Sequence, residues 1–436
     1  MKTATRRRMI ASVAMAAAAG IAVTGCSASG GTSDDGGVTL SMMAWANADE
    51  AKMYEKVLDV FEEKNPGVTV NFEYSDVAGY RDKLNTKFAA GTAPDVMFLV
   101  DRWIGEYTTR DALLDYAKYP ENIDFDAIDQ TFIDAYTTED GALYSIPTGS
   151  TAAGIIVNPA ILDQYGIPLP DDSTWSWDDF ADWSRSITEA SGGATYGSLF
   201  DLSWAPTLTT YVRQQGEDLY TQDGEFGIST PVLEDWFAKA VELHDTGAFA
   251  PAESADATGA FSAEESPIGS GLVASTVIPA NQLTSYDGVL KGEEILVRYP
   301  GEADGKRLGA SVTPTLQWTS AATTKHPEES ADLVDFLTND IDSYTDRGTF
   351  LGVPVNAEVA GELSANLKPV ETKFVDYVTS LAADDRDPLY PDPAGAGEVA
   401  DALTSIMTEV VFKRLTPAEA AARFTSEAET ALAQAG

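Results

Sequence analysis

The run Pro94-Asp95-Val96-Met97-Phe98-Leu99-Val100 decides the fold of this chain. From Val96 to Val100 every side chain is apolar, without the alternation that a strand with one face in water would show. A strand buried on both faces is typical of a parallel sheet with helices packed against it. The run therefore predicts an α/β fold.

The residues before this run supply the rest of such a unit. A β-rich apolar stretch covers Val38–Trp45, and apolar residues at helical spacing cover Ala48–Lys64, ended by Asn65-Pro66-Gly67. Apolar residues then alternate over 68–74, which predicts a strand, and a helix carries Tyr80, Leu84 and Phe88 at intervals of four. The order β-α-β-α-β implies a parallel sheet covered by helices.

The same alternation returns after Tyr144. We expect strands at 152–157 and 272–278, and helices at 177–188, 231–245, 330–338, 369–382 and 396–434, the last interrupted before Pro417. The stretch 248–271, rich in Ala, Ser, Gly and Glu, is the expected loop.

Charge excludes several classes of protein. The 436 residues hold 28 Lys and Arg against 69 Asp and Glu, a formal net charge of −41. So negative a surface repels phosphate backbones, which argues against a nucleic-acid partner. Two His and one Cys are too few soft ligands for a zinc or copper site, so any metal would have to be a hard, oxygen-bound ion. We expect neither a metal nor a cofactor.

The N-terminus has the pattern of an export signal. Lys2 and Arg6-Arg7-Arg8 precede an uncharged apolar run over 9–23, which is shorter than a membrane-spanning helix. Residues 1–25 are therefore expected to be a signal peptide, and their removal would leave a net charge of −45. The paired arginines fit a twin-arginine signal as well as a general one.

The single cysteine, in Val23-Thr24-Gly25-Cys26, resembles the lipobox of bacterial lipoproteins. That resemblance implies a lipid on Cys26, which would hold the protein at the outer face of the cytoplasmic membrane. Residues 26–37 contain no large apolar side chain after the cysteine and are expected to be a flexible tether.

Five stretches in order resemble the maltose-binding-protein-like family of extracellular solute-binding proteins, which serve carbohydrate ABC importers. They are VLDVFEEKNPGVTV (57–70), KLNTKFAAGTAPDV (83–96), YSIPT (144–148), PLP with TWSWDDF (168–170 and 174–180), and KHPEESA (325–331). The resemblance implies a two-lobed periplasmic-binding-protein-like fold with a hinge and an interlobe cleft. It implies one lobe from 38–149 plus 316–354, and another from 152–314 plus 357–436.

By the same resemblance the protein is a non-enzymatic receptor. It would capture a sugar or oligosaccharide in the cleft, close around it and deliver it to ABC permease subunits, acting as a monomer. Sugars need acceptors for their hydroxyls and flat aromatic surfaces for their C–H faces. Candidate residues should lie where loops leave the carboxyl ends of strands.

The first lobe offers candidates after each strand. Trp45 and Asn47 close the first strand, although Trp45 could equally belong to the core. Asp76 follows the second strand and could instead be a turn residue. Asp101-Arg102-Trp103 follows the third strand and resembles an Asp-Arg-Phe motif whose Asp and Arg bind sugar hydroxyls in that family. The alternative for Asp101 is a helix cap.

In the second lobe, Ser203 and Trp204 lie where the family places a stacking aromatic. Asn281 and Gln282 follow the 272–278 strand, where the family often has Trp-Ser-Asn-Gln; here Pro279-Ala280 replace the Trp, so stacking from that loop is in doubt. Trp318 is a further aromatic candidate at the hinge. We assign Trp175 and Trp177 to structure, at a helix start.

Three alternatives remain open from the sequence. A secreted lipoprotein glycoside hydrolase or lyase would also need carboxylates and aromatics, but no Gly-x-Ser-x-Gly elbow, phosphate loop or His-based site is found. A calcium module would use Asp384, Asp385, Asp387 and Asp392, but the prolines among them disrupt the ligand spacing, and a solvated acidic loop is favoured. Peptide-, phosphate- or metal-binding receptors of the same transporter system are the third alternative.

Overall fold

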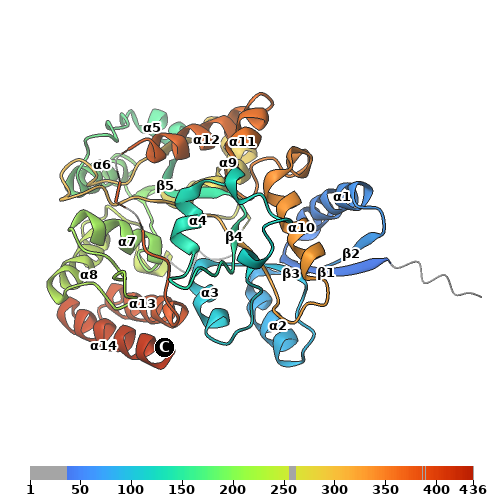
Figure 1. The fold of residues 1–436 in the computed structure, drawn as a ribbon. Coiled ribbons are helices and arrows are strands. Elements are labelled where there is room, and N and C mark those ends of the chain that lie inside the picture. Colours follow the sequence, from blue (N-terminus) through green and yellow to red (C-terminus); the bar gives the residue numbers. More distant parts are fainter. Residues whose placement is uncertain (1–36, 255–261, 385, 388, 436) are drawn as a thin grey trace, which may run out of the picture. The chain divides into compact units, whose positions relative to one another are not determined.

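Strand β1 (Val38–Trp45) is the first strand of a sheet built around the apolar run at 94–100. It pairs in parallel with β2 (Val68–Ser75) and with β3 (Val96–Leu99), as predicted. The computed structural model describes residues 37–254, 262–384, 386–387 and 389–435 (Figure 1). The expected signal peptide, the lipid site Cys26 and all but the last residue of the tether lie outside the described residues.

The first sheet has the strand order β2-β1-β3-β10-β4. Strand β10 (Gln317–Ser320) comes from far along the chain and runs antiparallel to both β3 and β4 (Ile146–Pro147). The helices of this half are α1 (Ala48–Lys64), α2 (Val77–Ala89), α3 (Asp101–Thr108), α4 (Gln130–Tyr136) and α10 (Pro327–Asn339), with short turns η1 (Tyr116–Lys118), η2 (Phe125–Ala127) and η5 (Ile341–Tyr344).

The second sheet has the order β6-β7-β5-β8. Its strands are β5 (Ser150–Val157), β6 (Tyr196–Ser198), β7 (Val273–Pro279) and β8 (Ile295–Val297), and β9 (Val312–Pro314) pairs with the start of β5. Only β6 and β7 are parallel here; β5 is antiparallel to β7, β8 and β9.

Helices surround the second sheet and form the C-terminal part of the chain. They are α5 (Pro159–Tyr165), α6 (Trp177–Ala190), α7 (Ala205–Gln214), α8 (Thr230–Asp245), η4 (Ala280–Gln282), α9 (Leu283–Leu290), α12 (Pro369–Ala382), α13 (Ala396–Val411) and α14 (Pro417–Ala435). The expected helix 396–434 is interrupted before Pro417, as predicted. None of the helices in the described residues is long and apolar enough to cross a membrane.

Each half has its own apolar core. Phe98 and Trp318 are buried in the first, and Trp177 and Trp236 in the second, where Trp177 lies edge-on to Trp236. Because each sheet covers its own core, the chain forms the two-lobed α/β architecture that the resemblance implies.

The chain crosses between the halves three times, near residues 148–150, 314–316 and 352–353, and these crossings pack closely together. The first two crossings are joined by main-chain hydrogen bonds: Thr148 N donates to Leu316 O at 2.9 Å, and Thr315 N donates to Gly149 O at 2.8 Å. On the third, Gly352 has a φ of 106°, and a Cβ there would lie 2.3 Å from Thr315 Oγ1. Only glycine fits that position, so the three passages are held against one another.

The segment after the third passage stays beside the first half. Asn356 donates to Asn339 at 3.1 Å, and α11 (Ala357–Ser364) packs against η5. Farther along the chain, Val370 and Phe374 of α12 are buried in a core cluster of the second half. These contacts favour a start of the second lobe later than residue 357; the other predicted lobe boundaries remain predictions.

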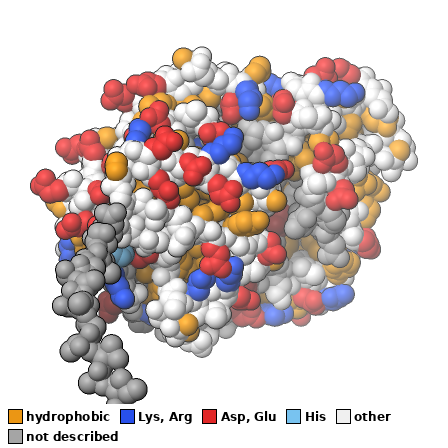
Figure 2. Space-filling model, turned by 90° about the vertical axis from the view of Figure 1, so that its right-hand side faces the viewer, with side chains coloured by type: hydrophobic (Ala, Val, Ile, Leu, Met, Phe, Trp, Pro, Cys, Tyr) orange, Lys and Arg blue, Asp and Glu red, His pale blue; other side chains and the backbone are white. Residues whose placement is uncertain are grey.

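The acidic composition is visible at the surface. On the face drawn in Figure 2, Asp and Glu side chains are spread among Lys and Arg rather than gathered into one patch. The negative charge is thus distributed over this face of the molecule.

Candidate functional site

Asp101 lies at the first turn of α3, directly after β3, and both of its carboxylate oxygens are held. Tyr136 Oη, from α4, donates to Oδ2 at 2.6 Å, and Gln317 Nε2, from β10, donates to Oδ1 at 3.2 Å. Three segments distant in sequence therefore meet at this carboxylate.

The Asp101 carboxyl is half-buried, and burial raises its pKa above the ordinary value. The hydrogen bonds from Tyr136 and Gln317 act in the opposite direction, as does the charge of Arg102. The donors stabilise the ionised form and fix the direction of the carboxylate, which is what a hydroxyl acceptor requires.

Across from α3 lies the loop that precedes α13. Gly105 packs so closely on it that a Cβ would be 2.6 Å from the Ala394 nitrogen. Arg81, which pairs with Glu106 at 2.6 Å, also lies 3.8 Å from Glu398 of α13. The two halves of the protein are thus in contact beside Asp101.

This loop carries Asp392 toward the same place. Burial, and then the negative charge of Asp101, raise the pKa of Asp392 to about 7, while Arg102 acts against them. The charges of Asp101 and Arg102 therefore act on Asp392 across the contact between the halves. A nearby negative charge disfavours ionisation of the Asp392 carboxyl.

Ion pairs fix the stem of the loop. Arg386 binds the buried Glu302 at 2.8 Å and Asp384 at 2.8 Å, and Arg307 binds Asp387 at 3.0 Å. The expected solvated acidic loop is therefore wrong for Asp384, which is partly buried and paired with two arginines. Asp387 is exposed and solvated, as expected, although Arg307 pairs with it; Asp385 lies outside the described residues.

Aromatic rings pack together at the ends of β1 and β3 and on α3. Trp45 is half-buried and lies edge-on to Tyr80, Phe98 and Trp103, with a centroid separation of 4.5 Å to Phe98. The guanidinium of Arg102 lies 5.4 Å from the Trp103 ring centre. Trp45 thus remains both a packing residue and a candidate stacking surface.

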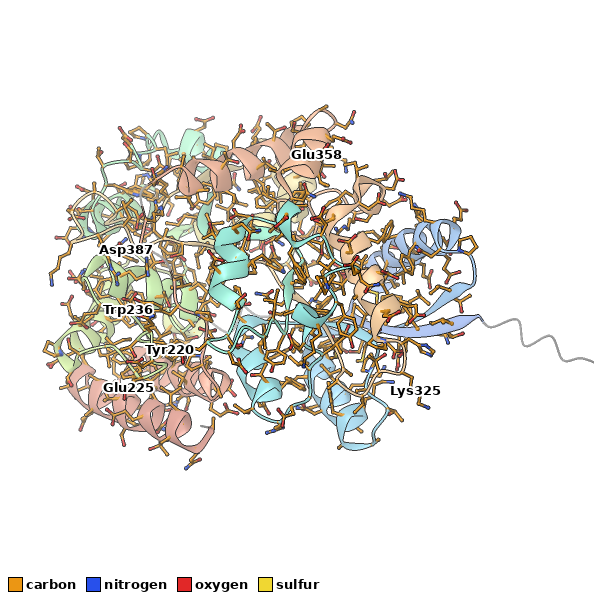
Figure 3. The ribbon with its side chains drawn as sticks, viewed as in Figure 1. Tyr220, Glu225, Trp236, Lys325, Glu358 and Asp387 are labelled. Carbon is orange, nitrogen blue, oxygen red and sulfur yellow. The ribbon has the colours of Figure 1, made fainter. Side chains whose placement is uncertain are left out.

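Tyr220, labelled in Figure 3, adds an aromatic ring from the second half. It is 6% exposed, and burial followed by the charge of Asp392 raises its pKa. Its ring therefore lies within the electrostatic reach of both Asp392 and Arg102.

Two predicted residues of the first half are helix caps. Asn47 Oδ1 accepts from the main-chain nitrogens of Asp49 and Glu50, and Asp76 Oδ1 accepts from Gly79 at 2.7 Å. The alternative reading of Asp76 as a turn residue describes its position, since it is the N-cap of α2.

The four predicted site residues of the second half have contacts that do not include Asp101. Ser203 Oγ donates to Asp201 at 2.6 Å, and Trp204 is the N-cap of α7, packed against the second core. Asn281 Nδ2 donates to the Phe350 carbonyl at 3.2 Å, which joins the two halves, and Gln282 is exposed. No contact places these four residues beside Asp101 among the described interactions.

Trp318 does not offer a surface to a solute. It is 0% exposed in the middle of the first sheet, where it pairs with Phe98 of β3. The prediction of a stacking role at the hinge is wrong, because β10 inserts between β3 and β4 and takes Trp318 into the core.

Four residues of this site were missed or misread in the sequence. They are Tyr136, Gln317, Tyr220 and Asp392, contributed by a helix, a strand and two loops. Gln317 had a signal, since it is a polar residue beside the apolar Trp318 in a short β-rich run. The others have only long-range neighbours, which a single sequence does not reveal.

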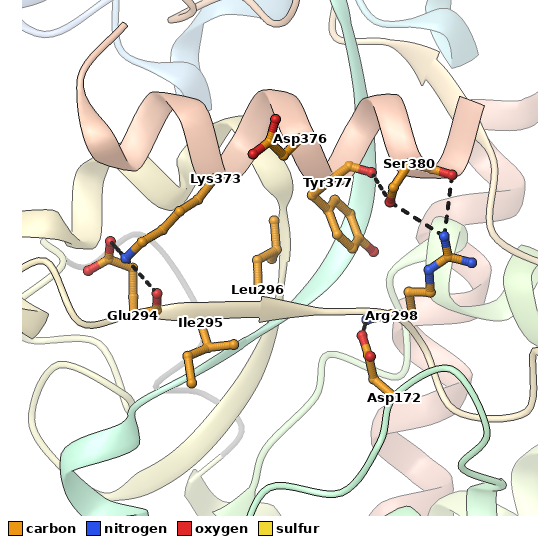
Figure 4. Close-up of a pocket in the computed structure, with 9 residues that line it drawn as sticks. All are labelled: Asp172, Glu294, Ile295, Leu296, Arg298, Lys373, Asp376, Tyr377 and Ser380. Atoms are coloured by element: carbon orange, nitrogen blue, oxygen red, sulfur yellow. Dashed lines mark hydrogen bonds and ion pairs between the residues drawn. The ribbon is translucent and has the colours of Figure 1, made fainter. Parts of the chain in front are cut away.

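A separate hollow of about 480 Å³ lies in the second half, between β8 and α12 (Figure 4). Lys373 Nζ donates to Glu294 at 2.9 Å within it, and Asp172 accepts from the Arg298 main-chain nitrogen at 2.8 Å. It includes none of the predicted site residues. In the described part of the chain no group of three or more His, Cys, Asp or Glu is placed to hold a metal ion.

Comparison with known proteins gives a family match. The model of the bacterial extracellular solute-binding protein family matches residues 41–342. A protein of Brucella abortus (strain 2308) named as a binding protein is 24% identical over 312 residues, which are 70% of this chain and 73% of that protein. The melibiose/raffinose/stachyose-binding protein of Bacillus subtilis (strain 168) is 27% identical over 179 residues, 40% of this chain and 39% of that one.

A solved structure has the same fold. The periplasmic oligogalacturonide-binding protein of Yersinia enterocolitica, in complex with saturated digalacturonic acid, superposes with a TM-score of 0.79 at 22% identity. The match covers 91% of this chain and 99% of that chain.

Proposed function

Because this chain belongs to the bacterial extracellular solute-binding protein family, we propose that it is the substrate-binding receptor of an ABC import system and captures a sugar or oligosaccharide. The observation that carries the proposal is Asp101, held by Tyr136 and Gln317 at the end of β3 and faced by Asp392 from the other half. A solute bound there would touch both halves, so its affinity would favour the closed form.

The chemistry around Asp101 suits a polyhydroxylated solute. A carboxylate of fixed direction accepts two hydroxyl hydrogens in charge-assisted bonds, and Arg102 supplies donors for ring or glycosidic oxygens. Trp45 and Tyr220 supply aromatic faces beside it. Two relatives of this fold and family are named for the sugars they bind, melibiose, raffinose and stachyose in one case and oligogalacturonide in the other.

The proposed receptor is not an enzyme. A glycoside hydrolase would also use two carboxylates. The family match is to solute-binding proteins, which supports a receptor rather than a hydrolase. Release of reducing ends from an oligosaccharide by the purified protein would favour the hydrolase instead.

We further propose that Cys26 carries lipid and holds the receptor at the outer face of the cytoplasmic membrane, where permease subunits would receive the solute from the monomer. The support is the Val23-Thr24-Gly25-Cys26 sequence after a basic and apolar leader. Cys26→Ser should release the protein into the medium, and mass spectrometry should find acyl chains on Cys26 of the parent only.

A thermal-shift screen against a panel of sugars tests the receptor function. A ligand at 100 times its dissociation constant stabilises the folded protein by about 2.7 kcal/mol, which is a readily measured rise in Tm. For a sugar that shifts Tm, Asp101→Ala should weaken binding by about 1–3 kcal/mol in calorimetry. Unchanged affinity would remove Asp101 from the site.

A further inference from the structure

Strand β8 is the last strand of the second sheet, so one of its edges has no strand beside it. That free edge borders the hollow of about 480 Å³, with α12 on one side of it (Figure 4). The edge of a strand presents main-chain N–H and C=O groups to whatever lies next to it. The direction of these groups in β8 therefore decides what the hollow can bind.

Hydrogen bonding within the sheet shows which main-chain groups of β8 face the hollow. Asn158 N donates to Ala274 O at 2.9 Å, so Asn158 and every second residue before it in β5 face β7. The residues of β5 between them face β8, where they lie opposite Ile295 and Val297. Leu296 therefore turns its N–H and C=O away from β5 and toward the free edge.

Side chains cover the outward main-chain groups on either side of Leu296. Lys373 Nζ, from α12, donates to the Glu294 carbonyl at 2.9 Å, and the Arg298 main-chain nitrogen donates to Asp172 Oδ2 at 2.8 Å. Both bonds agree with the alternation, since residues 294, 296 and 298 point the same way. Among the described residues, no hydrogen bond reaches the main-chain nitrogen or oxygen of Leu296 itself. The edge thus keeps one donor and one acceptor for a partner.

Negative charge without a cation lies around the same hollow. The two cations that line it, Arg298 and Lys373, are each paired with a carboxylate, at 2.8 and 2.9 Å. Asp172 and Asp376 also line it, and in the part of the chain that the structure describes neither takes part in an ion pair. The hollow therefore favours a partner with a positive charge and repels an acidic one.

We propose that the free edge of β8 is a docking site for an extended segment of a partner protein that carries a basic side chain. One residue of the segment pairs with Leu296, donating to its carbonyl and accepting from its N–H, so that the segment adds a strand to the sheet. The side chain of that residue lies on the same side of the sheet as α12, where a Lys or Arg reaches Asp376. The hollow shares no lining residue with the candidate sugar site, so the docking site does not rest on the receptor function.

Titration of the purified protein with short peptides, blocked at both ends, tests this assignment. The probe has the sequence threonine-valine-lysine-valine-threonine. In one counterpart glutamate replaces the lysine, and in the other the main-chain nitrogen of the lysine is methylated, which removes the donor to Leu296. The lysine peptide should bind at least about threefold more tightly than the glutamate peptide, as for exposed ion pairs. It should bind at least about fivefold more tightly than the methylated peptide, which lacks one hydrogen bond.

NMR spectra of the protein labelled on leucine locate the binding. The Leu296 amide signal, identified by its absence from Leu296→Ile, should move to lower field as the lysine peptide is added, because its N–H gains an acceptor.

Variants separate the charge from the edge. Asp376→Asn, at an exposed position, should reduce the preference for lysine over glutamate by at least about twofold and leave the effect of methylation unchanged. Asp59→Asn, at an exposed position on α1, is the matched control and should keep the full preference. Leu296→Pro removes the outward N–H but no bond to β5, and should abolish binding. If Leu296→Pro does not fold, the methylated peptide decides in its place.

Three results would overturn the assignment: equal binding of the methylated and unmethylated peptides, a Leu296 amide signal that does not move, or no binding of any of the peptides. So would a shift of the same signal with protein concentration alone, because the edge would then pair with a second copy of this chain.

Discussion

The negative charge of Asp101, at the start of α3, opposes ionisation of Asp392, in the loop before α13. Burial and the charge of Asp101 raise the pKa of Asp392 to about 7, and burial raises that of Asp101. Because the two residues belong to opposite halves, their protonation is coupled to the contact between the halves.

The first prediction concerns stability against pH. The folded-state pKa of Asp392 is above its ordinary value of 3.8, so between about pH 4 and pH 7 the folded state holds the proton that the unfolded state has lost. The free energy of unfolding should therefore decrease as pH rises through that window and level off above it. Asp392→Asn should be equally stable at pH 4 and more stable than the parent at pH 8, by about 1–2 kcal/mol after allowance for solvent screening.

Urea unfolding at pH 4, 6 and 8 measures this difference. Asp59→Asn, which changes an exposed carboxyl on α1, should follow the parent at every pH. A parent whose stability rises with pH relative to Asp392→Asn would contradict the raised pKa.

The second prediction concerns the contact between the halves. Gly105→Ala would place a Cβ 2.6 Å from the Ala394 nitrogen and 2.9 Å from its Cα, so the loop before α13 must move away from α3. We expect a larger radius of gyration in small-angle scattering with ligand present, and a loss of at least about tenfold in sugar affinity.

Gly361→Ala in α11 is the matched control, since a Cβ there meets nothing within 4 Å. Both changes gain up to about 1 kcal/mol in helix propensity, so that gain cannot account for a difference between them. Equal scattering and affinity in the two variants would show that the approach of Gly105 to Ala394 is not needed for closure.

The third prediction concerns the stem of the Asp392 loop. Glu302 is 6% exposed and accepts from Arg386 at 2.8 Å as well as from the main-chain nitrogens of Gly309 and Ala310. Arg386→Met would leave this carboxylate buried without its cation and should lower the free energy of unfolding by about 3–5 kcal/mol. Arg423→Met, which removes an exposed pair with Glu427, should cost at most about 0.5 kcal/mol. Similar urea midpoints for the two variants would contradict this role of Arg386.

The fourth prediction separates two tryptophans that the sequence treats alike. Trp318→Ala would empty a fully buried position and should cost about 3–5 kcal/mol of stability. Trp45→Ala removes a half-buried ring that packs edge-on to Trp103 of α3, and it should cost less stability but more sugar affinity. Urea unfolding and calorimetry on both variants measure the two effects, and the reverse order would contradict the placement of the binding site.

The local elements were predictable because their signals are local. The apolar run ending at Val100 predicts β3, Asn65-Pro66-Gly67 ends α1, and the helix predicted at 369–382 has those bounds. Asp101 was likewise predictable as a residue after a buried strand. Each of these inferences depends only on the pattern of residues that are near one another in the sequence.

What failed depends on pairing across long stretches of chain. Trp318 was misplaced because β10 joins β3 from more than 200 residues away, and that insertion decides whether the ring faces a cleft or a core. Asp392 was seen only as part of an acidic run, because its neighbour Asp101 lies in the other half. Side-chain patterns fix which residues are apolar, but not which distant segment covers them.

The most direct test of the account is a crystal structure of the protein with the sugar that gives the largest thermal shift. We predict that the sugar lies between α3 and the loop before α13, within hydrogen-bonding distance of Asp101 and Asp392. A sugar bound elsewhere, for example in the hollow between β8 and α12, with water alone beside Asp101, would contradict it.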